Sequence, residues 1–139
     1  MDDQNKIVIS SSTGNLARVR KYIEEKAIKT GADVDTINQI VMSVDEACTN
    51  VIKYAHHYDT NKKIKIEVFH TKKQFKVSIT YEGLEFDPNG VENPDMEEYF
   101  AKCKVGGLGV PMMKKFMNKI EYKCCSPNIN FLTLTKSLE

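Results

Sequence analysis

Long runs of one kind of residue are missing from this sequence of 139 residues. No apolar stretch approaches the ~20 residues of a membrane span, and the N-terminal residues MDDQNK do not form a signal peptide. No long block of basic residues occurs, and the formal net charge is +1. Because nucleic-acid binding needs clustered Lys and Arg to neutralise phosphates, we expect no direct nucleic-acid partner. These absences predict a cytoplasmic protein without a membrane contact.

The sequence also lacks the spacing of a structural zinc site. Its four cysteines include no CxxC pair. Cys124 and Cys125 are neighbours, so a bond between them would be strained, and reduced thiols are the default in the cytosol. The histidines, at positions 56, 57 and 70, have no metal-site spacing. We interpret them as helix-end and loop residues.

Apolar spacing predicts the order of the elements. Strands are expected at residues 6–10, 64–68, 75–79, 120–124 and 129–136, and helices at 16–27, 35–57 and from about 109 to 117. The two strands at 64–68 and 75–79 should form an antiparallel hairpin. Strands separated by helices, with few βαβ units, predict one α/β domain over residues 1–139. We expect an α+β two-layer sandwich with a mixed, mostly antiparallel sheet and helices on one face.

One polar face of the predicted helix at 35–57 carries candidate chemistry. At ~100° per residue, Glu46, Asn50 and Lys53 lie together opposite the apolar face. A carboxylate and a carboxamide one turn apart can hold a metal, or orient a hydroxyl beside a phosphate. The alternative is an ordinary solvated helix face.

A segment without apolar periodicity follows Tyr81 and extends to Val105, interrupted by glycine, proline and acidic residues. A connection of this length inside a compact domain is usually functional or mobile, and the alternative is a plain surface loop. Gly106, Gly107 and Gly109 end it and lead into a helix. Glycines before a helix N-terminus suit phosphates, because backbone N–H groups and the helix dipole face the anion. The spacing is neither a P-loop nor a Rossmann fingerprint.

The order of these motifs resembles the GHKL ATPase/kinase fold, and more closely the anti-sigma-factor serine/threonine kinases of the RsbW/SpoIIAB type. The motifs are E-A-x-T-N, a strand hairpin, E-G-x-x-F-D-P, a long segment, G-G-L-G and a closing hairpin. The resemblance implies that Glu46 is a general base, that Asn50 binds Mg²⁺ and that residues 89–105 form an ATP lid. It also implies a set of ATP-binding positions: Asn50, Lys53, Tyr81, Gly83, Phe86, Gly106, Gly107, Leu108, Gly109 and Val110. For Lys53 the alternative is a solvated lysine.

The resemblance further implies a function and partners. Members phosphorylate a small STAS-type anti-sigma-factor antagonist on serine or threonine, with ATP and Mg²⁺, and sequester a sigma factor, commonly as homodimers. Arg18 and Arg20 lie on the first predicted helix, where family members meet partners, although both also suit ordinary surface charge.

This sequence differs from the family in the motif that binds the adenine base. The family has D-x-G, whereas this sequence has Tyr81-Glu82-Gly83. Adjacent strand residues point to opposite faces, so Glu82 replaces the aspartate only if the chain slips or bulges. Losing a charge-assisted hydrogen bond to adenine would cost ~1.5–3 kcal/mol, or roughly 10- to 150-fold in affinity. The second hypothesis is therefore a non-catalytic module that binds partners with weakened or lost ATP binding.

Overall fold

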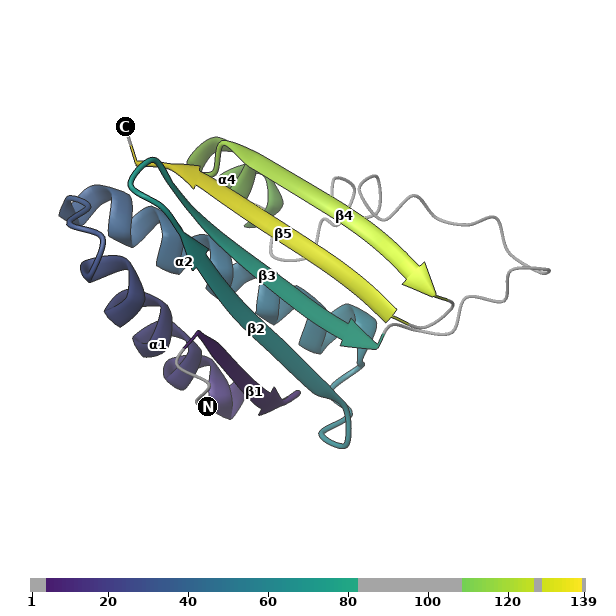
Figure 1. The fold of residues 1–139 in the computed structure, drawn as a ribbon. Helices are drawn as coiled ribbons and strands as arrows, with labels where there is room; N and C mark the ends of the chain where they lie inside the picture. The colour runs from purple at the N-terminus through teal and green to yellow at the C-terminus, as the bar shows by residue number, and fades with distance from the viewer. Residues whose placement is uncertain (1–4, 83–108, 127–128, 139) are drawn as a thin grey trace.

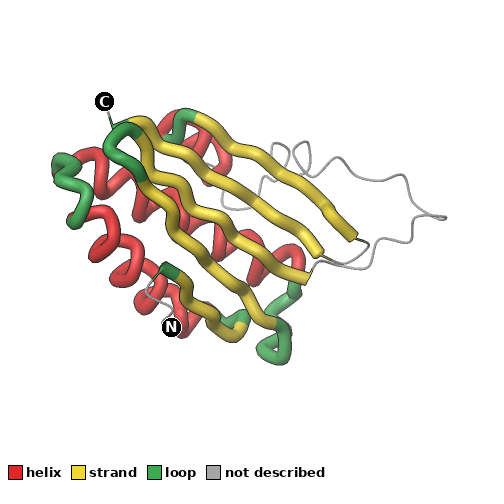
Figure 2. Tube along the Cα trace, viewed as in Figure 1, coloured by secondary structure: helices red, strands yellow, loops and turns green. Residues whose placement is uncertain are grey.

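The computed structural model describes residues 5–82, 109–126 and 129–138. A five-stranded sheet is covered on one face by helices, as Figures 1 and 2 show. The strands are β1 (Lys6–Ser10), β2 (Lys63–His70), β3 (Gln74–Glu82), β4 (Lys119–Ser126) and β5 (Ile129–Ser137). The helices are α1 (Leu16–Ile28), α2 (Val34–Asn50) and α4 (Gly109–Phe116), with a 3-10 turn η1 (Thr13–Asn15) and a π-helical turn η2 (Val51–Ala55).

The strand order is β1-β2-β3-β5-β4, and each neighbouring pair of described strands is antiparallel. The predicted two-layer sandwich with a mostly antiparallel sheet is therefore confirmed. Helix α2 packs between α1 and α4 behind the sheet (Figure 1). Within the described residues, no helix is both long enough and apolar enough to cross a membrane.

The core lies between the sheet and the helices. Alternate residues of β2 and β3 point into it, as their period of two predicted. The α1 stripe is buried at the spacing of one helix face, through Leu16, Val19, Ile23 and Ala27. Met113 of α4 and Met117, which follows this helix, are also buried in the core.

The second helix differs from its prediction at its C-terminal end. We expected one helix through residue 57, but α2 ends at Asn50 and a π-helical turn follows. There the N–H of His56 donates to the carbonyl of Val51, five residues back. His57 and Tyr58 then have φ values of 49° and 64°, which end the helix. A π-turn holds an extra residue, and such turns are frequent at functional sites.

Candidate functional site

The candidate base, Glu46, lies on α2 with its side chain half-buried. Burial raises the pKa of Glu46, the neighbouring charge of Asp45 raises this pKa further, and Lys53 lowers it. A carboxylate whose pKa lies closer to neutrality is a better proton acceptor than an ordinary glutamate. The position can therefore take a proton from a hydroxyl.

Asn50, the last residue of α2, is only 3% exposed. The alternative considered above, an ordinary solvated helix face, is therefore wrong for Asn50, because this residue is buried at the C-terminal end of α2. Among the residues that the structure describes, the amide nitrogen Nδ2 has no hydrogen-bond partner. A buried polar group without a partner costs about 1–3 kcal/mol, so it calls for a functional explanation. A ligand oxygen could accept its hydrogen bond.

Lys53 lies one turn beyond Asn50, in η2, and is half-buried. The α-helix changes to a π-helical turn between the two residues. Lys53 is therefore rotated about the helix axis relative to its position in a continuous α-helix. Within residues 5–82, 109–126 and 129–138, no group of three or more His, Cys, Asp or Glu could hold a metal ion alone.

Tyr81 lies near the end of β3 and is 2% exposed. Its Cα pairs in regular register with Ile64 on β2 and with Asn130 on β5. The register continues without a bulge to Glu82, which pairs with Ile129 and is exposed. Tyr81 therefore points into the helix-covered core, and Glu82 does not take its place.

Two buried polar residues beside Tyr81 were not predicted. Asn130 is 2% exposed; its Nδ2 donates to the carbonyl of Tyr81 at 3.4 Å, and its Oδ1 accepts from the Tyr122 hydroxyl. On the other side, the ring of His56 meets that of Tyr81 edge-on, with centroids 6.0 Å apart. The position of the expected aspartate is thus occupied by Tyr81, whose ring packs against the ring of His56. These two residues form the aromatic cluster.

His56 caps the C-terminal end of η2, as expected of a helix-end residue, and its side chain also connects this end to two other segments. It is 3% exposed, and its ring nitrogens lie 2.7 Å from Ser11 Oγ and 2.6 Å from the carbonyl of Glu82. Because a carbonyl only accepts, Nε2 carries the proton and Nδ1 accepts from the serine hydroxyl. His56 therefore fixes the C-terminal ends of η2 and β3 together.

This arrangement predicts a pH-dependent stability. Burial lowers the pKa of His56 below its ordinary value of 6.5. The unfolded chain then binds the proton more readily, so the free energy of unfolding should fall as the pH drops below 6.5, until the folded-state pKa is reached. Urea unfolding at a series of pH values should show this loss.

The exposed neighbour His57 supplies a matched control. His56→Gln should remove most of the pH dependence, whereas His57→Gln should keep it. An equal slope in both variants would show that other groups cause the effect.

The glycine cluster lies only partly within the described residues. Gly109 and Val110 are the first residues of α4, where glycine begins a helix as predicted. The remaining ATP-site positions lie outside the described residues: Gly83, Phe86, Gly106, Gly107, Leu108 and the expected lid at 89–105.

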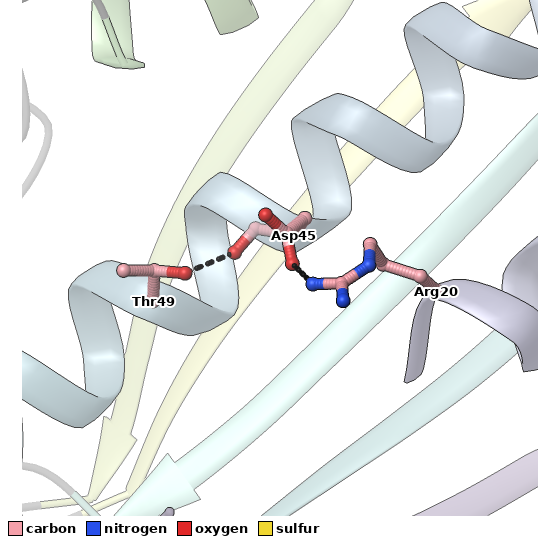
Figure 3. A network of polar contacts seen from close by, with 3 residues as sticks. All are labelled: Arg20, Asp45 and Thr49. Carbon is pink, nitrogen blue, oxygen red and sulfur yellow. Dashed lines mark hydrogen bonds and ion pairs between the residues drawn. The ribbon is translucent and has the colours of Figure 1, made fainter. Parts of the chain in front are cut away.

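Arg18 and Arg20 are exposed on α1. Arg20 is not simply solvated, because its Nη1 donates to Asp45 Oδ1 of α2 at 2.8 Å (Figure 3). This contact connects α1 to the residue directly before Glu46, and it was not predicted from the sequence.

Comparison with known proteins identifies the family of this fold. The family model of the histidine kinase-like ATPase domain matches residues 9–136. The chain belongs to this family. In this chain, Glu46 and Asn50 lie on α2 and Tyr81 lies on β3 of the five-stranded sheet.

Several named relatives within the family are similar to the chain. The serine-protein kinase RsbW of Halalkalibacterium halodurans is 29% identical over 125 residues, which cover 87% of this chain and 75% of that protein. The RsbW of Bacillus subtilis is 27% identical over 107 residues, or 73% and 66% of the two chains. The anti-sigma F factor of Clostridium beijerinckii is 24% identical over 127 residues, or 86% and 84%. Two of these relatives are named serine-protein kinases, and the third is named an anti-sigma F factor.

Proposed function

We propose that this protein is an anti-sigma factor with ATP-dependent serine/threonine kinase activity. Its substrate would be a STAS-type anti-sigma-factor antagonist, and it would also sequester a sigma factor, as a cytoplasmic homodimer. The names of the relatives support this class. The observation that carries the proposal is the pairing, one helical turn apart, of Glu46, whose pKa is raised, with a buried Asn50 whose Nδ2 has no partner among the described residues.

The phosphate end of the site fits Mg-ATP. The carboxamide of Asn50 can donate to a phosphate oxygen through Nδ2 or, turned over, offer its oxygen to a cation, since the two orientations are nearly indistinguishable. Lys53 lies one turn further along the chain, in η2, and supplies a basic side chain. Bound Mg²⁺ would neutralise charge on the transferring phosphoryl group.

Glu46 would act on the acceptor rather than on the nucleotide. Its carboxylate would accept the proton of an incoming serine or threonine hydroxyl as the oxygen attacks the γ-phosphorus. The half-buried position keeps the carboxylate less hydrated than a surface glutamate, which favours proton transfer. The backbone N–H groups at the start of α4, at Gly109 and Val110, would add hydrogen bonds to the phosphates.

The direct test is phosphoryl transfer to a candidate acceptor. The protein would be incubated with Mg-ATP and the STAS-domain proteins of its own genome, one at a time, and phosphoserine or phosphothreonine would be detected by mass spectrometry. One acceptor should be modified at a single hydroxyl residue. A complete panel without any phosphorylated acceptor would reject the kinase activity.

A second function is favoured by one specific observation, the buried Tyr81 at the position of the expected adenine-binding aspartate. In this alternative, the protein binds a sigma factor or an antagonist without catalysis. Partner affinity would then be indifferent to nucleotide. A large change in affinity on adding Mg-ATP would exclude this alternative.

Asn50→Leu should separate stability from nucleotide binding. Leucine is close in size and removes the buried Nδ2, which has no partner among the described residues, so the free energy of unfolding should rise by about 1 kcal/mol. The same change should abolish the increase in melting temperature that Mg-ATP gives the wild-type protein, because that increase depends on binding to the folded state. Differential scanning fluorimetry with and without Mg-ATP measures both effects.

Asn38→Leu provides the matched control, since Asn38 lies on the same helix and is exposed. It should leave both the stability and the nucleotide response nearly unchanged. If Asn50→Leu destabilised the protein and kept the full response to Mg-ATP, Asn50 would be a structural residue.

A further inference from the structure

His56 holds the C-terminal end of β3 at the point where pairing with β2 stops. The register of β3 with β2 ends at Tyr81, whereas its register with β5 continues to Glu82. The ring nitrogen Nε2 of His56 donates to the carbonyl of Glu82 at 2.6 Å. A side chain from the end of η2 therefore continues the hydrogen bonding of β3 beyond its last pair with β2.

The other ring nitrogen of His56 is fixed from the side of β1. Nδ1 lies 2.7 Å from Oγ of Ser11, which is fully buried. The backbone N–H of Ser11 in turn donates to the carbonyl of Lys62, the residue before β2, at 2.9 Å. Both ring nitrogens are thus hydrogen-bonded, and the ring cannot turn without losing both bonds.

The same histidine contacts Tyr81 and ends the turn that contains Lys53. The rings of His56 and Tyr81 meet edge-on, with centroids 6.0 Å apart. The backbone N–H of His56 donates to the carbonyl of Val51, the first residue of η2. Lys53 lies within this turn, and Asn50 directly precedes it. His56 therefore joins the segment expected to bind phosphates to the strand end expected to bind the base.

We propose that His56 is a positioning residue for nucleotide binding, because it fixes the end of β3 and the ring of Tyr81 relative to η2. This inference rests on the proposed binding of Mg-ATP. Without the bond to Glu82, the nucleotide would have to order the last residue of β3 when it binds. Ordering the backbone of one residue corresponds to a loss of roughly 5- to 30-fold in affinity.

Two substitutions of His56 each keep one of its two ring hydrogen bonds. His56→Asn places its amide near Nδ1, so it keeps the bond to Ser11 and does not reach Glu82. His56→Gln places its amide near Nε2, so it donates to Glu82 and loses the bond to Ser11. Each variant loses one buried hydrogen bond, and both should unfold at a lower urea concentration than the wild-type protein.

Calorimetric titration of the full chain with Mg-ATP should separate the two variants. His56→Asn should bind roughly 5- to 30-fold more weakly than the wild-type protein, because the end of β3 is released. His56→Gln should bind with nearly wild-type affinity. Amide hydrogen exchange at the end of β3, measured without nucleotide, should be faster in His56→Asn than in His56→Gln.

Ser11→Ala and His57→Asn are the matched controls. Ser11→Ala removes the same bond as His56→Gln, so it should lower the stability and keep the affinity for Mg-ATP. His57 is exposed, and asparagine readily adopts its φ of 49°, so His57→Asn should change neither quantity.

Equal Mg-ATP affinities in His56→Asn and His56→Gln would overturn the proposal. So would a loss of affinity in Ser11→Ala as large as that in His56→Asn, since lower stability alone would then explain both. Where His56→Asn does not fold, His56→Gln decides the question. Nearly wild-type affinity would support the contact with Glu82, and a loss of roughly 5-fold or more, despite the retained donor, would overturn it.

The titration needs no phosphoryl acceptor, so this proposal and the kinase activity fail separately. A protein with the expected order of affinities that modifies no acceptor would reject the kinase activity and keep the role of His56. A protein that phosphorylates an acceptor, with equal Mg-ATP affinity in all variants, would keep the kinase activity and reject the role of His56. A wild-type protein that binds no Mg-ATP would overturn both.

Discussion

Glu46→Gln is expected to reduce phosphoryl transfer by roughly 10²- to 10⁴-fold, the usual contribution of a general base. The amide has nearly the same size as the carboxylate but cannot accept the proton of the attacking hydroxyl. Burial disfavours the charged form of Glu46, as its raised pKa indicates, so the neutral amide should be tolerated in the fold. Affinity for Mg-ATP should therefore remain close to that of the wild-type protein.

The measurement is a single-turnover assay with a saturating acceptor, together with calorimetric titration of Mg-ATP. Glu24→Gln, an exposed acid of α1, is the control and should leave the rate unchanged. In the wild-type protein the rate should fall as the pH drops through the pKa of Glu46, because the protonated acid is no longer a base. An unaffected rate in Glu46→Gln would remove Glu46 from the mechanism.

The sheet could be predicted from the sequence because its signal is local. Alternating apolar residues in β2 and β3 report a buried face directly, and the structure buries Ile64, Ile66, Phe75, Val77 and Ile79 as the period of two requires. The same rule correctly placed Tyr81 and Glu82 on opposite faces, since the register of β3 has no bulge before its end.

The surroundings of the candidate site could not be predicted in this way, because they depend on contacts between distant residues. His56 meets Ser11 across 45 positions, and Asn130 reaches Tyr81 across 49. Helical periodicity also gave no sign of the π-turn after Asn50, since it assumes a constant 100° per residue. The sequence therefore identified the candidate chemical groups, and only the fold revealed which neighbours tune them.

Tyr81→Asp is expected to increase the affinity for ATP by roughly 10- to 150-fold. This increase corresponds to the free energy of one charge-assisted hydrogen bond to the adenine amino group, about 1.5–3 kcal/mol. The same change should lower the free energy of unfolding by roughly 3–5 kcal/mol, because it removes a core aromatic ring and buries a carboxylate. Calorimetric titration below the melting temperature of each variant measures the affinity.

Two further variants separate the ways in which Tyr81 could weaken ATP binding. Tyr81→Ala removes the ring and adds no acceptor, so any gain in affinity from it measures steric blocking by the ring. Tyr81→Asn adds a neutral acceptor and should give a smaller gain than Tyr81→Asp. If the wild-type protein bound ATP tightly and all three variants weakened binding, the aromatic cluster of Tyr81 and His56 would itself contribute to base recognition. The absence of the aspartate would then mark a different mode of nucleotide binding and not its loss.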